Sequence, residues 1–418
     1  MRKDSQVKQK SQRISLVGLL LLFCLSFLVV HGPASAQQPG YPKTANYYLG
    51  PTPTTPTNIA KLASYDLVIL PVESQISDRA LMKELRRRNP HILLLAYVSS
   101  QSFNFEFWTD SLHQGLLAHI KKSWWLSDTA GQNVSSWPGT KSLSVISPWH
   151  DYFPQHLAKN VYATGLWDGI FLDEFSLSIS WLNNGDLDNQ KDGLTDDPEI
   201  LDAAWRHGSL RLLSQLRQQL GPQAIIITNG VSDPEVSRYA NGRMLEDFPT
   251  PWEDNGSWSG SMKLYLQGQA NSTYPPVDVI NITTHDTGHR DLKHERLGLA
   301  STLLGNGYVS IDYGIADHGQ LWLVDGSSNL KLGQPLGEPI NLLDPKNPAI
   351  TDSLWRRQFA NGLVLANATN QPQTVHFNQP LRQITGDAFP LTLNPNLSQT
   401  WTIPAKDGLI LTNLPIQP

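Results

Sequence analysis

The sequence is nearly free of cysteine, and this removes several kinds of chemistry. Among 418 residues the single cysteine is Cys24, which lies inside an apolar run from Ile14 to Val30. If that run is removed with an export signal, the remaining chain has no thiol. Disulfides, thiolate nucleophiles and cysteine-bound metals are then excluded. A chain of this length must rely on its hydrophobic core for stability.

The first 36 residues have the three regions of a secretory signal peptide. A basic start, the apolar run and the small residues Ala34-Ser35-Ala36 follow one another, which predicts cleavage before Gln37 and a secreted protein. The alternative is an uncleaved membrane anchor, because the apolar run approaches the shortest length that spans a bilayer. The small residues favour cleavage, so no membrane contact is expected of the mature chain.

Positive charge is scarce in the mature chain. The whole sequence has 32 basic and 37 acidic residues, and the signal takes away five and one, which leaves 27 and 36 and a net charge of about −9. Nucleic acid is therefore excluded as a partner, since it requires a basic footprint. The sequence also lacks a G-x-G-x-x-G turn after its first expected strand and an H-E-x-x-H helix, which removes support for dinucleotide binding and for a zincin mechanism.

Short apolar runs alternate with helical patterns along most of the chain, and eight of these runs predict buried strands. The expected strands are residues 46–49, 65–73, 91–99, 167–173, 223–230, 242–248, 277–286 and 307–314. The expected helices are residues 77–88, 105–122, 150–164, 197–220, 259–269 and 290–304. Eight strands separated by helices predict an α/β fold, a (β/α)8 TIM barrel over residues 37–325. The alternative is a doubly wound open sheet.

The last quarter of the chain has a different pattern. Residues 326–353 are rich in Gly, Pro and Asn and predict a linker. Residues 354–418 contain short β runs separated by Asn, Gly and Pro, which predicts a small C-terminal antiparallel β domain. Two of its acids, Asp387 and Asp407, stand beside turn residues. We therefore expect this domain to pack on the barrel without supplying a catalytic residue.

Two expected strands end on a pair of carboxylates. Asp173-Glu174 follows one apolar run, and Glu246-Asp247 follows another. The carboxyl ends of barrel strands meet at one mouth, and crowded like charges cost stability, so this convergence favours a functional site. Paired carboxylates without a thiol favour acid–base chemistry, which glycoside hydrolysis requires, and that reaction needs no cofactor.

Polar and aromatic residues near the same strand ends are expected to bind the substrate, a polysaccharide or oligosaccharide. Thirteen tryptophans provide flat surfaces for sugar rings, although core packing explains many of them. The expected substrate-binding residues are Tyr47, Glu73, Tyr97, Glu174, Asn229, Asp247, Trp252 and Asp312. We expect a monomer.

Two other functions stay open on the sequence. One is a carbohydrate-binding barrel at the cell surface that has no catalytic activity. The other is a metal-dependent polysaccharide deacetylase, whose ligands would be His285, Asp286 and His289.

Several segments resemble a known group of enzymes. The motif Asp168-Gly169-Ile170-Phe171-Leu172-Asp173, residues 124–131 and 137–139, and Thr228-Asn229-Gly230 resemble the "hypothetical glycosyl hydrolase 15" group of TIM-barrel glycoside hydrolases, which is similar to the endo-α-1,4-polygalactosaminidases. The resemblance covers most of residues 41–320. It implies an Asp nucleophile at the end of strand 4 and a Glu acid/base at the end of strand 6, here Asp173 and Glu246, and hence a retaining reaction. Strand alternation predicts that only one residue of each acidic pair points inward.

A loop after the fourth strand has the spacing of a calcium-binding loop. Its ligand positions are filled by Asp188, Gln190, Asp192, Asp196 and Glu199, with Gly193 at the turn. This spacing predicts a structural calcium ion, although glutamine at the third position would be a weak ligand. The alternative is a polar loop that caps the helix beginning near residue 197.

Overall fold

A computed structural model describes residues 40–230, 233–314, 317–322, 332–385, 392–393 and 396–413. The expected signal peptide (residues 1–36), Asp387 and part of the expected linker lie outside these residues. Within the described ranges, no helix is both long enough and apolar enough to cross a membrane.

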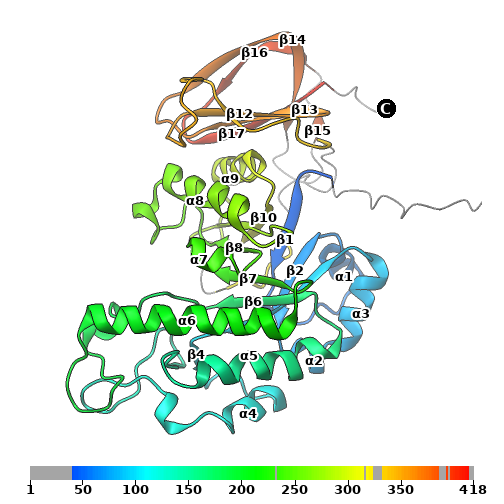
Figure 1. Ribbon diagram of the computed structural model, residues 1–418. Helices are drawn as coiled ribbons and strands as arrows, with labels where there is room; N and C mark the ends of the chain where they lie inside the picture. The colour runs from blue at the N-terminus through cyan, green and yellow to red at the C-terminus, as the bar shows by residue number, and fades with distance from the viewer. Residues whose placement is uncertain are drawn as a thin grey trace, which may run out of the picture. The chain divides into compact units, whose positions relative to one another are not determined.

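Eight parallel strands close into a barrel in the order β1-β10-β9-β8-β7-β6-β3-β2 (Figure 1). They are β1 (Lys43–Tyr47), β2 (Leu67–Pro71), β3 (Leu93–Ser99), β6 (Gly169–Asp173), β7 (Ile225–Asn229), β8 (Gly242–Leu245), β9 (Val279–Thr283) and β10 (Tyr308–Asp312). The predicted TIM barrel is confirmed. The doubly wound sheet is wrong because β1 pairs with β10, which leaves no open edge.

Alternate side chains of each strand fill the barrel interior. On β6, Phe171 lies in the inner cluster, whereas Ile170 and Leu172 belong to the layer between the strands and the outer helices. This alternation is the two-residue period of a β-strand. The next inward position on β6 is Asp173, so the strand delivers this acid to the carboxyl end of the barrel.

The start of β6 explains the first half of the D-G-x-x-L-D motif. The Asp168 carboxylate accepts hydrogen bonds from the Leu94 amide (2.7 Å) and from the Arg86 guanidinium (2.8 Å). A Cβ atom added to Gly169 would lie 1.8 Å from the carbonyl oxygen of Ile225, so only glycine fits against β7. These two residues hold the strand in place at the end opposite Asp173.

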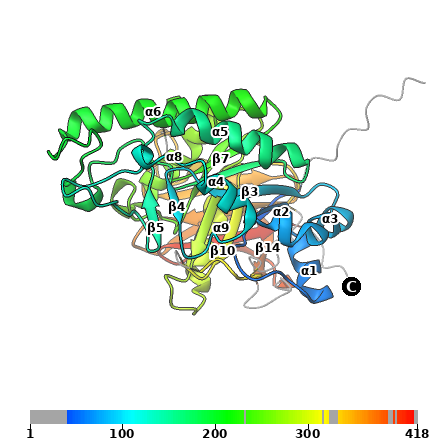
Figure 2. The same cartoon turned by 90° about the horizontal axis from the view of Figure 1, so that it is seen from below.

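The helices largely follow the predicted pattern and cover the outside of the barrel. They are α1 (Pro56–Ala63), α2 (Ser74–Ser77), α3 (Arg79–Arg88), α4 (Ser111–Leu117), α5 (Trp149–Asn160), α6 (Pro198–Leu220), α7 (Pro234–Ser237), α8 (Trp258–Asn271) and α9 (Leu292–Leu304), with short 3-10 turns at Lys122–Trp124, Tyr162–Thr164, Leu182–Gly185 and Asp254–Gly256. Helices α5 and α6 lie side by side in both views (Figures 1 and 2). The sequence predicted neither α1 nor α7, each of which is short and begins at a proline.

A long insertion separates β3 from β6. The helix expected over residues 105–122 is shorter, because the Asp110 carboxylate caps α4 by accepting from the amides of Leu112 and His113. Two three-residue strands, β4 (Ser102–Asn104) and β5 (Thr140–Ser142), pair antiparallel and were not predicted. The insertion is therefore anchored at both ends beside the carboxyl end of β3.

The C-terminal domain is an antiparallel sheet, as predicted. It consists of β11 (Ile340–Asn341), β12 (Leu354–Phe359), β13 (Gly362–Asn367), β14 (Gln373–Thr385), β15 (Thr392–Leu393), β16 (Ser398–Ile403) and β17 (Asp407–Thr412). Strand β11 pairs with β12, so part of the expected linker belongs to this sheet. The exact domain boundaries stay a prediction.

The sheet packs on helix α9 of the barrel. Leu297, Ala300, Val364 and Ile410 lie in one buried cluster that joins the two parts. A Cβ atom added to Gly408 would lie 2.1 Å from the Arg296 carbonyl oxygen, so the backbone of β17 approaches the helix closely.

Candidate active site

Neighbouring strands aim three polar side chains at one point above the barrel interior. Asp173 ends β6, Asn229 ends β7, and Glu246 follows β8 directly. Each stands two residues beyond an inward core residue of its own strand, so strand alternation turns all three into the mouth. The result is a row of two acids with one amide between them, which we call the catalytic row.

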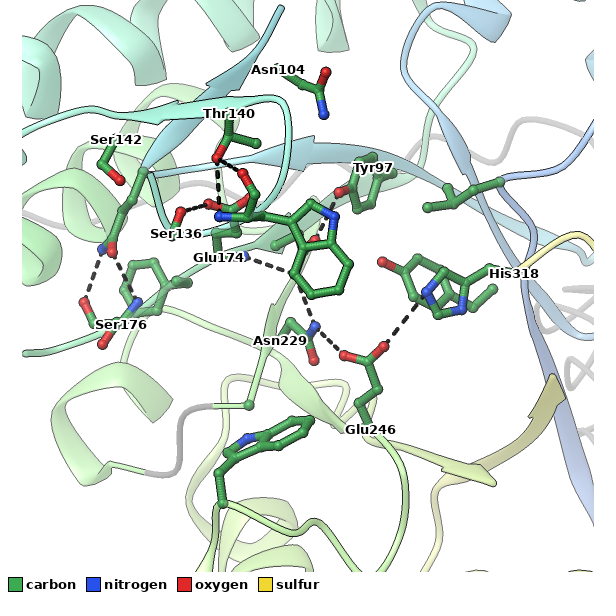
Figure 3. Close-up of a pocket in the computed structure, with 18 of the residues that line it drawn as sticks. Tyr97, Asn104, Ser136, Thr140, Ser142, Glu174, Ser176, Asn229, Glu246 and His318 are labelled. Atoms are coloured by element: carbon green, nitrogen blue, oxygen red, sulfur yellow. Dashed lines mark hydrogen bonds and ion pairs between the residues drawn. The ribbon is translucent and has the colours of Figure 1, made fainter. Parts of the chain in front are cut away.

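The Asn229 amide nitrogen joins the two acids. It lies 2.9 Å from Oδ1 of Asp173 and 2.7 Å from Oε2 of Glu246 (Figure 3). The two carboxylate oxygens are therefore at most about 5.6 Å apart, the sum of these distances. Since the two N–H bonds of an amide diverge by about 120°, a separation of about 5 Å follows.

Further donors hold Asp173 in place. Its Oδ2 accepts from the Tyr97 hydroxyl at 2.7 Å, and its Oδ1 also accepts from the Glu174 amide at 2.8 Å. Burial, followed by the charge of Asp173, raises the pKa of Tyr97 well above its usual value, so this hydroxyl keeps the proton that it donates. Both oxygens of Asp173 are thus fixed relative to the cavity.

Glu246 is buried, with 7% of its surface exposed. Burial raises the pKa of Glu246 to about 7, with further contributions from the charges of Asp173 and Asp312, while His318 opposes the shift. A carboxyl group with this pKa is partly protonated at neutral pH, as a general acid must be.

His318 lies beside Glu246 and was not predicted. Its Nε2 is 3.6 Å from Glu246 Oε1, and its Nδ1 lies 2.8 Å from Oδ2 of Asp312. Burial opposes the charged imidazolium, but the carboxylates of Asp312, Glu246 and Asp173 together raise the pKa of His318. The only signal in the sequence was a histidine shortly after the eighth strand, so nothing there could distinguish it from an ordinary loop histidine.

Glu174 also enters the cavity, although it follows Asp173 directly. Its backbone has φ +48°, outside the extended range, so it leaves the alternation of the strand. Its carboxylate accepts from the Ser136 hydroxyl of the insertion at 2.6 Å. Burial, and then the charge of Asp173, raises the pKa of Glu174 to about 7. Both members of this pair therefore point inward, unlike the expectation.

A cavity of about 1130 Å³ surrounds the catalytic row. Six of the expected substrate-binding residues and both expected catalytic residues line it: Tyr47, Glu73, Tyr97, Asp173, Glu174, Asn229, Glu246 and Trp252. Residues of the insertion and of the segment after β6, among them Phe107, Ser136, Trp137 and Trp181, line it as well and were not predicted. The sequences of these loops have no helical or strand periodicity, so the sequence alone does not show that they reach the mouth of the barrel.

Two expected substrate-binding residues lie outside this lining. Asp247, with φ +54°, bonds to the Thr283 hydroxyl and lies 3.0 Å from Nδ1 of His285. Asp312 is buried and accepts from His318 and from the Asn281 amide. Asp312 thus holds His318 in position by a hydrogen bond, and Asp247 belongs to the loop that follows β8.

The expected calcium loop is closed by its own hydrogen bonds. The Asp188 carboxylate accepts from the backbone amides of residues 191 to 193, and the Asp196 carboxylate accepts from Asn189 and Gln190. In addition, Asp197 caps α6 through the amides of residues 199 and 200. This network accounts for the loop without an ion, and calcium there stays a prediction.

One other group of residues could hold a metal ion, and the group expected from the sequence does not form. Among the described residues, only Glu73, Asp110 and His113 bring three acidic or imidazole ligand atoms within 4.8 Å of one another. His285, Asp286 and His289, the set required by the deacetylase hypothesis, do not form such a group and do not line the cavity. In the first group Asp110 is occupied in capping α4, as described above.

The closed (β/α)8 barrel thus places two acids, bridged by hydrogen bonds from one side-chain amide, at the ends of its fourth and sixth strands. A sequence-family model described as hypothetical glycosyl hydrolase family 15 matches residues 86–363. This match covers more than half of the chain, so the chain belongs to that family and is a glycoside hydrolase. A comparison with curated protein sequences gave no significant match.

Solved structures of glycosidases are similar in fold. A GH27 β-L-arabinopyranosidase from Geobacillus stearothermophilus has a TM-score of 0.51 and 9% identity, over 91% of this chain and 97% of that one. A GH36 α-galactosidase from the same organism gives 0.49 and 12%, over 89% and 55%. A maltogenic α-amylase from Thermotoga neapolitana gives 0.48 and 11%, over 89% and 99%. At 9% identity the first of these likenesses shows the fold alone, and nothing is concluded from the other two.

Proposed function

We propose that this protein is a secreted, retaining glycoside hydrolase in which Asp173 is the nucleophile and Glu246 is the acid/base. The observation that carries the proposal is the hydrogen bonding of the single Asn229 side-chain nitrogen to both acids, which limits the distance from Asp173 Oδ1 to Glu246 Oε2 to at most about 5.6 Å. Retaining enzymes hold their two carboxyl groups about 5–5.5 Å apart, whereas inverting enzymes leave about 6.5–9.5 Å for a water molecule.

The two acids then have separate roles in each half of the reaction. The Asp173 carboxylate attacks the anomeric carbon while Glu246 gives its proton to the departing oxygen, which forms a glycosyl–enzyme ester and a free alcohol. Glu246, now a carboxylate, takes a proton from water as that water attacks the anomeric carbon, which breaks the bond to the Asp173 oxygen and releases the sugar and the Asp173 carboxylate. The raised pKa of Glu246 supports the first role, and the nearby His318 stabilises the carboxylate in the second.

The proposal is tested on protein recovered from the growth medium, whose N-terminus should be Gln37. A panel of aryl glycosides and polysaccharides identifies a substrate, and NMR of the first product gives its anomeric configuration. Retention is expected, and an inverted first product would overturn the mechanism.

Substitutions then test the two roles. Asp173→Asn keeps the shape but removes the nucleophile, so turnover should fall by about 10³-fold or more. Glu246→Gln should reduce turnover by about 10²–10⁴-fold on substrates with poor leaving groups and far less on those with good ones. Asp247→Asn, beside Glu246 but outside the cavity, should have a much smaller effect. If Asp247→Asn or Glu174→Gln abolished activity while Asp173→Asn and Glu246→Gln kept it, the roles would be assigned wrongly.

A further inference from the structure

The exposed tryptophans of the protein gather at one place. Of the 13 tryptophans in the sequence, all within the described ranges, only three are more than one third exposed: Trp137 (41%), Trp181 (59%) and Trp252 (57%). All three line the cavity around the catalytic row. Leaving an indole in water forfeits its burial energy, so three of them around one cavity point to a ligand with flat apolar faces.

These rings come from loops at both ends of the catalytic row. Trp137, with Phe107, belongs to the β3–β6 insertion, and Trp181 lies in the loop that follows β6, the strand that ends at Asp173. Trp252 follows β8, beyond Glu246. In the barrel the strands stand in the order β3-β6-β7-β8, so these loops leave the barrel toward the two ends of the catalytic row.

The cavity also reaches well beyond the catalytic row. Figure 3 shows Asn104, Ser136, Thr140 and Ser142 of the insertion grouped on one side, across the pocket from Glu246 and His318. Within the described residues, the buried Ser142 hydroxyl and the Asn229 amide oxygen have no hydrogen-bond partner. Buried polar atoms without a partner are costly, so Ser142 and Asn229 keep unused hydrogen-bonding capacity at the wall of the cavity.

The charge of the lining narrows the ligand class. Among the described residues, six acidic side chains line the cavity, those of Glu73, Asp173, Glu174, Glu246, Glu253 and Asp317, together with His318 and with no lysine or arginine. Burial keeps two of the six, Glu174 and Glu246, partly protonated near neutral pH. A polymer of uronic acids would bring its own negative charges against them, which is unfavourable at short range.

We propose that the cavity binds an internal stretch of a polysaccharide chain without negative charge, with sugar rings stacked on Trp137 and Trp181 on one side of the catalytic row and on Trp252 on the other, so that the enzyme cuts within the chain. This inference rests on the proposed function for the cleavage step, but the binding step stands independently of it. A cavity of about 1130 Å³ exceeds the roughly 300–1,000 Å³ typical of sites for one small ligand, which agrees with several sugar units.

Binding is measured first, with the Glu246→Gln variant so that the polymer is not consumed. Affinity electrophoresis through soluble starch, galactomannan, arabinoxylan and glycol chitosan should show retardation by at least one of them, and polygalacturonate should cause none. Adding Trp137→Ala or Trp252→Ala should weaken that retardation about tenfold, since each removes one stacked aromatic surface. Ile200→Ala removes a side chain that is 69% exposed on α6 and lies outside the cavity, and it should change nothing.

Cleavage is measured second, with the unmodified protein on the polymer that binds. Viscosity should fall faster than reducing ends appear, and the first products should be mixed oligosaccharides. Retardation by polygalacturonate alone, by none of the five polymers, or equally in the tryptophan variants would overturn the inference, as would release of monosaccharides only. Tryptophan-dependent retardation without hydrolysis of any substrate would contradict the proposed function and leave the binding inference standing.

Discussion

Two carboxyl groups in the cavity hold their protons near neutral pH, and both do so mainly because they are buried. Burial raises the pKa values of Glu174 and Glu246 to about 7, and the charge of Asp173 adds to each shift. In the unfolded chain both would titrate near the ordinary value of 4.5. Folding therefore retains protons that the unfolded chain releases between about pH 4.5 and 7.

This difference predicts how stability depends on pH. A group whose pKa is raised by folding contributes stability that is complete below its unfolded pKa and is lost as the pH rises through its folded pKa. Glu246→Gln, which is neutral at every pH, should therefore gain stability relative to the unmodified protein between pH 5 and pH 8, by up to about 3 kcal/mol. Thermal unfolding at both pH values measures the change, and Glu174→Gln should behave in the same way. A stability difference independent of pH would contradict the prediction.

The catalytic row could be predicted from the sequence because each member follows a recognisable buried strand. The strand period and the strand order placed Asp173, Asn229 and Glu246 at one mouth, whereas the choice of Asp173 over Glu174 and of Glu246 over Asp247 came from the family resemblance. His318 could not be found this way, because it lies in the loop after the last barrel strand. Only the folded structure shows that it binds Asp312 and lies beside Glu246. The inward position of Glu174 depends on one dihedral angle, which a strand pattern does not encode.

At the scale of elements, the strands were predictable and the insertion was not. The runs that form β3, β6 and β7 are apolar, local and bounded by turn residues. In contrast, β4 and β5 have three residues each, and their pairing joins residue 102 to residue 142. No local pattern indicates contacts at that separation, so the length of the insertion indicated a binding loop but not which of its residues line the cavity.

The loop between β6 and α6 carries a prediction about calcium. If an ion binds the folded loop through Asp188, Asp192 and Asp196, calcium at 100 times its dissociation constant should add about 2.7 kcal/mol to the free energy of unfolding. The melting temperature should then be lower in EDTA than in calcium, and Asp192→Asn should abolish the difference. Equal melting temperatures, after metal removal is confirmed, would mean that the loop serves only to cap α6.

At the scale of the whole molecule, the β domain and the barrel share a junction at α9. The Arg296 guanidinium donates to both oxygens of Asp407 at 2.9 and 2.8 Å, and the carboxylate is almost fully buried. Neither residue lines the cavity. The position of Asp407 agrees with the expectation that this domain supplies no catalytic residue, which stays a prediction until it is tested.

Asp407→Asn tests this division. Loss of the buried charge partner should lower the free energy of unfolding by about 1–3 kcal/mol, while kcat/KM of the folded protein stays near normal. A control at the same junction is Asp352→Asn, which breaks the exposed pair with Lys406 (3.0 Å) and should cost about 0–1 kcal/mol. Loss of turnover in folded Asp407→Asn would contradict the prediction.

The long insertion between β3 and β6 supplies much of the cavity wall but neither acid of the catalytic row. If the proposed function holds, the two acids that break the bond and much of the surface that contacts the substrate belong to separate parts of the chain, since β4 and β5 of the insertion are not strands of the closed barrel. Descendants of this chain could exchange or reshape residues 104–140 and acquire new substrates, while inheriting the same bond-breaking chemistry unchanged.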